Sequence, residues 1–501
     1  MQVELKETRD VADLVGRLLD AFRNEEVTYC HWKSNITLSR ALAGEEDLDL
    51  LVDRESLPRA LRVLADLGFK GAAARSGPRP PGVGHYYGLD RKAGKLIHVH
   101  LYNRVVTGES LLKGHALPFE EMLLGNPALV GKIRIASKPA ELVVFVLRMF
   151  VKYGSVLDIA RLAGSSGAIR RELLWLLEGD GMTEALALLD RHCPPVGEPL
   201  FRICVEALRG DASLVRRYLL ARSVRRRLRV YAVRTPVERS LALLGLLLVQ
   251  LRRRITARKK DKILHAGGAL IAFVGADATG KSTLSSETAR WLGKTFAVRT
   301  VHLGKPPSSW LTTPVNVLLP MARWLLSGGR GGAQVPHAAP PKPTSEAVLT
   351  RPPTLPNALR AAALAWDRHR LALRVSRAAA RGEIVVCDRY PAESIGAPDG
   401  PRLSVGRGRG VFQESLARLE GKLYRNIPPP DLVLRLMAPV NTAKRRNRER
   451  DKADGEEYLE ARHIQILEWS RRGTKRTCDI DTDRPLTETI AAVRDAVWRF
   501  L

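Results

Sequence analysis

The stretch Gly275-Ala-Asp-Ala-Thr-Gly-Lys-Ser-Thr283 constrains the fold of this chain more than any other feature. It matches G-x-x-x-x-G-K-[ST], the pattern of loops that wrap nucleotide phosphates. The preceding apolar run, residues 269–274, is typical of a buried parallel strand, and apolar residues at helical spacing follow the loop. Backbone N–H groups and a helix N-terminus can converge on phosphate oxygens only in this order. The stretch therefore predicts nucleotide binding, and an ordinary strand–turn–helix with a chance match is the alternative.

Within this loop, each residue type has an expected task. A side chain at Gly280 would block the approach of a phosphate, and Lys281 is expected to be exposed and to reach the outer phosphates. The Ser282 hydroxyl is expected on Mg²⁺. The residues predicted to bind the nucleotide are Gly275, Asp277, Ala278, Thr279, Gly280, Lys281, Ser282 and Thr283.

Length and charge set broader limits. The chain has 501 residues, which predicts two or three domains rather than one core. Its formal net charge is +28, from 81 Lys+Arg against 53 Asp+Glu. Such an excess attracts anions, whether nucleotides, nucleic acid or an acidic membrane surface, although an Arg-rich composition can also be a general habit of a proteome.

The cysteines and apolar segments exclude several classes of protein. The 5 cysteines are widely spaced and form no C-x-x-C pair, so neither a disulfide framework nor a zinc site is indicated. A reducing, cytoplasmic location is the default expectation. Glu4, Glu7 and Asp10 interrupt the N-terminal apolar residues, which argues against a signal peptide. The apolar run at 241–251 is too short to span a bilayer as a helix.

Residues 1–135 are predicted to form a small α+β domain. In it, Asp47 and Asp49 lie two positions apart at the start of an apolar strand, so they share one face. Two carboxylates on one face can share a divalent ion, which makes them candidate metal ligands. Solvated or capping acids at a strand edge are the other interpretation.

This arrangement resembles the nucleotidyltransferase superfamily, in which a G-S pair precedes D-x-D and a later strand carries a third carboxylate. Here Lys33-Ser34-Asn35 stands in place of G-S, and the later strand offers His98 and His100 instead of an acid. The resemblance implies the fold. The altered turn and the missing third acid predict that nucleotidyl transfer is absent, because two-metal chemistry is incomplete.

Residues 136–262 are predicted to be a helical, basic region. An apolar helix at 241–251 lies between arginine clusters. Such a helix can lie on an anionic membrane surface, with contacts spread over 216–260, or it can be a buried packing helix with solvated ends. Few aromatic residues are interleaved with the arginines, so no specific nucleic-acid binding is expected.

Residues 263–501 are predicted to form an α/β domain. Strands expected at 298–303, 383–388 and 431–437 alternate with helical segments, among them 359–380. Alternation of this kind predicts a parallel sheet with helices on both faces and ligands at the carboxyl ends of the strands. Residues 306–357 are predicted to be a mobile insertion, because 327–357 are rich in Gly, Pro and Ala.

Several segments of this domain resemble, in order, thymidylate kinase among the P-loop nucleoside monophosphate kinases. They are the loop with an acid at its third position, Trp366-Asp367-Arg368, Asp388-Arg389-Tyr390, Pro430-Asp431-Leu-Val-Leu and Ala443-Lys-Arg-Arg446-Asn-Arg-Glu-Arg450. The resemblance covers roughly residues 268–500.

The resemblance implies ATP and Mg²⁺ as cofactors and a role for each segment. Lys281 would hold the donor phosphates, and Asp388 at the end of a strand would order Mg²⁺ through water. Arg389 would clamp the phosphate of the acceptor, and Arg446 and Arg450 would complete the site as lid arginines.

The segments that read the acceptor base depart from the family. His302-Leu-Gly-Lys305-Pro306 stands in place of T-R-E-P, and Pro391-Ala-Glu-Ser-Ile-Gly396 in place of a segment ending Y-Q-G. The expected activity is transfer of the ATP γ-phosphate to a dTMP-like nucleoside monophosphate. A kinase for a sugar in polysaccharide assembly and a nucleotide-switched scaffolding protein are the alternatives.

Overall fold

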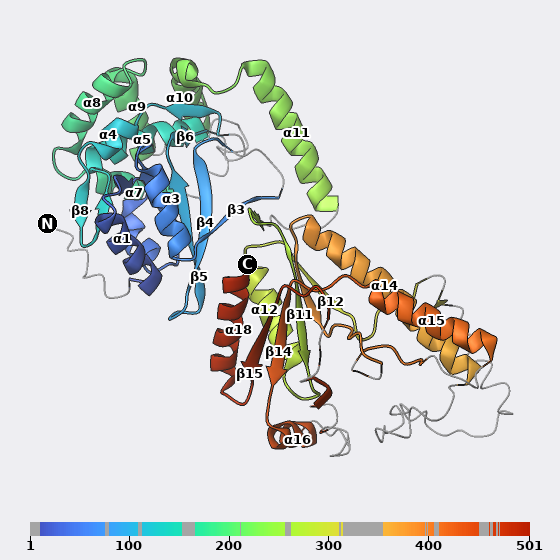
Figure 1. The fold of residues 1–501 in the computed structure, drawn as a ribbon. Helices are drawn as coiled ribbons and strands as arrows, with labels where there is room; N and C mark the ends of the chain where they lie inside the picture. Colours follow the sequence, from blue (N-terminus) through green and yellow to red (C-terminus); the bar gives the residue numbers. More distant parts are fainter. Residues whose placement is uncertain are drawn as a thin grey trace. The chain divides into compact units, whose positions relative to one another are not determined.

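The computed structural model of the chain describes most of both halves of the sequence. The described residues are 11–75, 80–108, 113–152, 166–210, 212–255, 262–309, 312–313, 354–395, 397, 399–404, 410–449, 460, 464–466, 469 and 471–501. Contacts between residues cluster the chain into two compact units, Met1–His265, here called unit 1, and Ala266–Leu501, here called unit 2 (Figure 1). No helix in the described part of the chain is long and apolar enough to cross a membrane.

Unit 1 contains a mixed β-sheet. The strands of unit 1 are β1 (Tyr29–His31), β2 (Leu48–Val52), β3 (Lys70–Ala74), β4 (Val83–Asp90), β5 (Lys95–Tyr102), β6 (Val105–Thr107), β7 (His115–Leu117), β8 (Ala128–Val130), β9 (Ile133–Ile135) and β10 (Lys262–Leu264). Eight of them form one sheet in the order β10-β3-β4-β5-β2-β1-β9-β8, and β6 pairs with β7 in a separate hairpin. The pairs β2–β5 and β1–β9 are parallel.

Unit 1 also contains helices, most of which pack on the two faces of this sheet. They are α1 (Asp13–Asn24), α2 (Leu38–Leu42), α3 (Leu57–Asp66), α4 (Glu120–Leu124), α5 (Lys138–Lys152), α7 (Ser166–Leu176), α8 (Gly181–His192), α9 (Glu198–Arg209), α10 (Leu214–Arg227) and α11 (Pro236–Ile255), with 3-10 turns η1 (Asn35–Thr37) and η2 (Leu228–Tyr231). Side chains alternate along β2, so Leu48 and Leu50 pack with α1 and α3 while Leu51 packs with α5. The helices from α5 to α10 therefore share a core with the sheet.

Unit 2 is a parallel α/β fold. Its strands are β11 (Ala269–Gly275), β12 (Val298–His302), β13 (Ile384–Asp388), β14 (Leu432–Met437) and β15 (Arg476–Asp481). They form one sheet in the order β12-β13-β11-β14-β15, and every pair is parallel. The central strand β11 is buried at every residue, as expected for a strand covered on both faces.

Unit 2 also contains helices, most of which lie on the two faces of the sheet. They are α12 (Lys281–Leu292), α14 (Leu355–Ala380), α15 (Val411–Arg425), α16 (Val440–Arg448) and α18 (Leu486–Phe500). Helices α12 and α18 pack against each other on one face, where Trp291 meets Trp498, and α14 and α15 pack on the other (Figure 1). The predicted parallel sheet with helices on both faces is confirmed.

The sheet order also positions a ligand site. The connection from β11 leads to β12 at one edge of the sheet, whereas that from β14 leads to β15 at the opposite edge. In open α/β sheets ligands bind where neighbouring connections diverge, at the carboxyl ends of the strands. The loop between β11 and α12 lies at this end. Most of the predicted insertion at 306–357 lies outside the described residues.

Candidate functional site

The loop after β11 is curled by two left-handed residues. Ala278 has φ 65° and Gly280 has φ 87°, and the second residue is the N-cap of α12. Left-handed residues within a turn direct neighbouring backbone N–H groups toward one concavity, which suits an anion. Gly275 is also required, because a Cβ there would lie 2.6 Å from Thr279 Oγ1 and 3.0 Å from the Leu436 carbonyl oxygen. The loop is thus shaped before any ligand arrives.

Lys281 lies inside this loop. Its Nζ donates hydrogen bonds to the carbonyl oxygens of Gly275 at 3.0 Å and Ala276 at 2.6 Å. The side chain is only 7% exposed, so the expectation of an exposed lysine is wrong. Burial lowers its pKa to about 8, although the carboxylate of Asp277 favours the charged form. A phosphate would restore the charge that burial disfavours.

Ser282 and Asp388 contact each other at the carboxyl end of the sheet. The Ser282 hydroxyl donates to Asp388 Oδ2 at 2.8 Å, and Asp388 ends β13. The other carboxylate oxygen, Asp388 Oδ1, is buried and has no hydrogen-bond partner among the described residues. His302 Nδ1 donates to the Asp388 carbonyl oxygen at 3.0 Å. A hydroxyl beside an unpaired carboxylate oxygen is a donor set that fits Mg²⁺.

Arg389 links the loop to the segment after β13. Its Nη2 donates to Asp277 Oδ1 at 2.9 Å, and its Nη1 lies 3.5 Å from Asp399 Oδ2. The backbone of Arg389 is left-handed, with φ 70°, and its N–H donates to the Phe273 carbonyl oxygen. A bulky residue adopts this conformation rarely, and such strain clusters at functional sites. Asp277 lies 3.8 Å from Lys281 Nζ, so one carboxylate connects the two cations.

The partner Asp399 is itself held by Arg368 on α14. Arg368 is almost fully buried, and its guanidinium donates to Asp399 Oδ1 at 2.9 Å and to the carbonyl oxygens of Leu303 and Gly304. A Cβ at Gly304 would lie 2.6 Å from Arg389 Cδ, so a larger residue there would displace the Arg389 side chain. Arg368 belongs to the predicted segment Trp366-Asp367-Arg368, whereas no role was predicted for Asp399. The only local signal was its turn-forming context, because an aspartate tolerates the left-handed φ of 58° seen here.

A small pocket joins these groups. Its lining includes Lys281, Arg389 and Asp399 together with Ile466 and Trp469 from the segment before β15. Trp469 was not predicted as a site residue, because no sequence pattern around a lone tryptophan separates a site residue from a core residue.

The predicted lid arginines are not brought to the loop by any contact in the described structure. Arg446 on α16 donates from Nη2 to the Thr482 carbonyl oxygen at 2.8 Å. Arg450 lies outside the described residues.

Of the predicted loop residues, Thr279 is buried and donates to the Ala276 carbonyl oxygen, whereas Ser282 and Thr283 are exposed at the start of α12.

In unit 1, Asp47 and Asp49 face two histidines of the parallel neighbour strand. His98 Nδ1 donates to Asp47 Oδ1 at 2.6 Å, and His100 Nδ1 lies 3.1 Å from Asp49 Oδ1. Lys33 Nζ lies 2.8 Å from the same oxygen of Asp49. Burial opposes ionisation of Asp49, but Lys33 and His100 outweigh it and hold its pKa well below the usual range.

These contacts pair each acid with a cationic or hydrogen-bonding group of the protein. Among the described residues, no group of three or more His, Cys, Asp or Glu side chains is arranged to hold a metal ion. The ring of His85 stacks on that of His100, with centroids 4.3 Å apart, and burial lowers the pKa of His100 to about 4. The metal-ligand role of Asp47 and Asp49 stays a prediction.

The turn at Ser34 and Asn35, which precedes these acids, is held by a side chain of α5. Asn35 donates through its backbone N–H and its side-chain Nδ2 to the two carboxylate oxygens of Glu141, at 3.1 and 2.7 Å. Asn35 Oδ1 lies 2.6 Å from His31 Nδ1. The preceding Ser34 is left-handed, with φ 58°. The helical region therefore shapes the segment that stands in place of the G-S pair.

Glu141 makes the stability of unit 1 depend on pH. Burial raises its pKa to about 7 from 4.5, against the opposing hydrogen bonds from Asn35. Between these values the unfolded chain is ionised while the folded chain holds the proton, so stability falls as pH rises. We expect Glu141→Gln to lose this pH dependence. The unfolding midpoint of the variant, relative to that of wild type, should therefore rise as pH increases from 4.5 to 7. Parallel midpoints for the two proteins over this range would contradict the assignment.

No protein-family model matches the chain. An uncharacterized ATP-binding protein, YghR, of Escherichia coli (strain K12) is 28% identical over 232 residues, which are 46% of this chain and 86% of that protein. A thymidylate kinase of Chromohalobacter salexigens is 33% identical over 129 residues, which are 25% of this chain and 57% of that kinase. These similarities are weak, and with the loop and the parallel sheet they support a P-loop nucleotide-binding unit of kinase-like type.

Proposed function

We propose that unit 2 transfers the γ-phosphate of ATP to a phosphorylated acceptor of the nucleoside monophosphate kind, with dTMP as the reference acceptor. The observation that carries this proposal is the placement of Arg389 beside Lys281, with Asp277 in contact with both, at 2.9 and 3.8 Å. A kinase needs one cation for the donor phosphates and another for the acceptor phosphate, within reach of each other.

In the proposed reaction, the loop N–H groups and Lys281 bind the β- and γ-phosphates of ATP. Arg389 binds the acceptor phosphate through its planar fork and aims one phosphate oxygen at the γ-phosphorus. A bond forms between that oxygen and phosphorus, the bond from phosphorus to the β-bridging oxygen breaks, and ADP leaves. Lys281 and the loop dipoles neutralise the charge that spreads over the transferred group.

Mg²⁺ fits this site through Ser282 and Asp388. The hydroxyl of Ser282 and the unpaired carboxylate oxygen of Asp388 would hold the ion, directly or through water. When bound, the ion supplies charge neutralisation at the phosphates of ATP. The His302 ring keeps Asp388 in place by donating a hydrogen bond to the backbone carbonyl oxygen of Asp388.

A sugar or sugar phosphate is the second candidate acceptor. The observation that favours it is the segment His302–Pro306, which lacks the residues that thymidylate kinases use near the base. In this segment the Leu303 and Gly304 carbonyl oxygens accept from Arg368, so they are occupied within the protein. An acceptor recognised by its phosphate and hydroxyls would need neither of them.

The experiment is ADP release from ATP with the purified full chain and a panel of nucleoside monophosphates, sugars and sugar phosphates. Because the base contacts of the family are missing, we expect catalytic efficiency for dTMP to exceed that for other pyrimidine monophosphates by less than about a hundredfold, about 2.7 kcal/mol. A stronger preference would mean that other residues rebuild a base site. ATP binding without acceptor-dependent ADP release from any compound would contradict the kinase proposal and favour a nucleotide-switched scaffold.

A further inference from the structure

Helix α11 of unit 1 exposes an apolar stripe. Val237, Leu241, Leu244 and Leu248 are 69%, 65%, 56% and 59% exposed. Their spacing of four, three and four residues places them on one face of the helix. None of the four belongs to a hydrophobic core of the described structure. A contiguous apolar face of this kind indicates an interaction surface.

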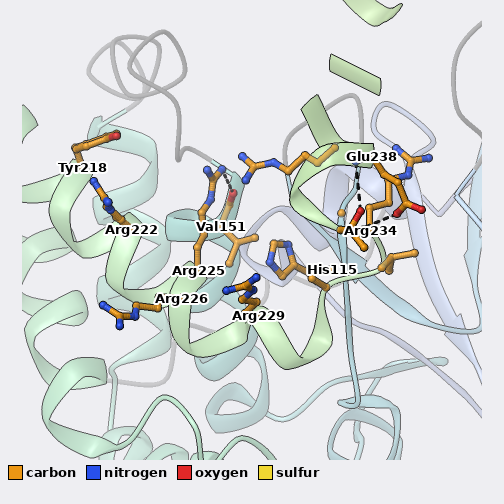
Figure 2. Close-up of a pocket in the computed structure, with 14 residues that line it drawn as sticks. His115, Val151, Tyr218, Arg222, Arg225, Arg226, Arg229, Arg234 and Glu238 are labelled. Atoms are coloured by element: carbon orange, nitrogen blue, oxygen red, sulfur yellow. Dashed lines mark hydrogen bonds between the residues drawn. The ribbon is translucent and has the colours of Figure 1, made fainter. Parts of the chain in front are cut away.

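A strongly basic pocket adjoins the first turn of the same helix. Figure 2 shows arginines of α10 and η2 on one side of this pocket and the start of α11 on the other. The pocket has a volume of about 980 Å³. The arginines that line it are Arg222, Arg225, Arg226, Arg229, Arg234 and Arg239.

Positive charge predominates in this pocket. Its lining contains a single carboxylate, Glu238, which accepts a hydrogen bond from the Thr235 backbone N–H and so caps α11. Arg222, Arg226 and Arg229 are exposed to solvent. The other lining residues with ionisable side chains are His115 and Tyr218.

We infer that α11 and this arginine pocket together form a docking surface for an anionic lipid bilayer. The stripe from Val237 to Leu248 is about 16 Å long at 1.5 Å per residue, which is too short to cross a bilayer of about 30 Å but suits a helix lying in the interface. The apolar side chains enter the acyl region, and the arginines of the pocket beside the first turn of α11 bind headgroup phosphates.

The charge selects this occupant over two others. A second copy of the chain would bring the same arginines to a two-fold interface, where they would repel their counterparts. A nucleic acid would match the arginines but would leave the apolar stripe in water, and no aromatic side chain of the stripe offers a base-stacking platform. An anionic bilayer satisfies both parts of the surface.

The test is flotation of the full chain with phosphatidylcholine vesicles that contain or lack phosphatidylglycerol. We expect binding only to the anionic vesicles, and weaker binding at high salt. A variant with Arg222, Arg226 and Arg229 changed to Gln should lose about a hundredfold in affinity, at about fivefold per arginine. A variant with Leu241, Leu244 and Leu248 changed to Gln should lose at least about tenfold.

Matched controls separate these effects from general charge and from misfolding. Changing the exposed Arg17, Arg54 and Arg62 to Gln removes the same charge from unit 1, and Leu129→Gln removes an exposed leucine of β8. Both controls should bind as wild type does, and circular dichroism should match for all variants. The inference is overturned if wild type does not float, if it floats equally well with neutral vesicles, or if the leucine variant only dissociates an oligomer in solution.

Discussion

Lys281→Ala is expected to lower kcat/KM for phosphotransfer about a hundredfold or more, which corresponds to about 3 kcal/mol of transition-state stabilisation. The Lys281 ammonium already lies within the loop, against the carbonyl oxygens of Gly275 and Ala276. It needs to move little to meet a phosphate, and the interaction strengthens as charge spreads over the transferred group. The measurement is acceptor-dependent ADP release under substrate-limited conditions.

Lys281→Met serves as the partner variant, because it keeps the buried stem and removes only the charge. Burial lowers the pKa of Lys281 to about 8 from 10.5, so below pH 8 the folded state holds an ammonium that its surroundings disfavour. Removing that charge should leave the unfolding midpoint at pH 7 unchanged or raised. Lys294→Ala, which removes an exposed lysine just beyond α12, should keep full activity. Wild-type turnover in either Lys281 variant would contradict the proposed role.

The sequence predicted unit 2 well because its signals are local. A buried strand, a glycine-rich loop and a helix follow one another within residues 269–292, and each is specified by neighbouring residues. The strands at 384–388 and 432–437 also followed from their apolar runs and flanking glycine or proline. Ser282 and Asp388 were each predicted to serve Mg²⁺, and in the structure a hydrogen bond joins them at the carboxyl end of the sheet.

The electrostatic links of the site could not be predicted in the same way. The contact between Arg389 and Asp399 depends on where Asp399 lies after β13 and on Arg368, which holds Asp399 from helix α14. The left-handed backbone conformation of Arg389 could not be predicted from the sequence, because arginine seldom adopts this conformation. The burial of Lys281 likewise depends on side chains that surround the loop only in three dimensions.

In unit 1 the period-two pattern placed Asp47 and Asp49 on one face, and the structure places His98 and His100 opposite them. Two other features needed the structure. Strand β10 is too short to show periodicity, yet it pairs with β3 at the edge of the sheet. The sequence left open whether the apolar helix at 241–251 is buried, because exposure depends on what packs against it.

Arg389→Lys is expected to lower kcat/KM about a hundredfold, about 2.7 kcal/mol, for every phosphorylated acceptor alike. The guanidinium of Arg389 spans Asp277 and Asp399, at 2.9 and 3.5 Å, and these carboxylates raise its pKa against the effect of burial. A lysine ammonium is a point charge and cannot reproduce the planar fork that binds two phosphate oxygens. The measurement is initial ADP release with dTMP, other nucleoside monophosphates and sugar phosphates.

A non-phosphorylated acceptor separates recognition of phosphate from general damage to the site. If Arg389 binds the acceptor phosphate, the same substitution should leave any transfer to thymidine or a free sugar within about threefold of wild type, since that interaction is absent in both proteins. Arg299→Lys is the matched control, because Arg299 on β12 pairs at 2.8 Å with Glu383, the residue just before β13, and not with Asp277 or Asp399. A loss confined to dTMP would instead assign Arg389 to recognition of the nucleoside. An equal loss with thymidine would mean that Arg389 acts on the γ-phosphate of ATP.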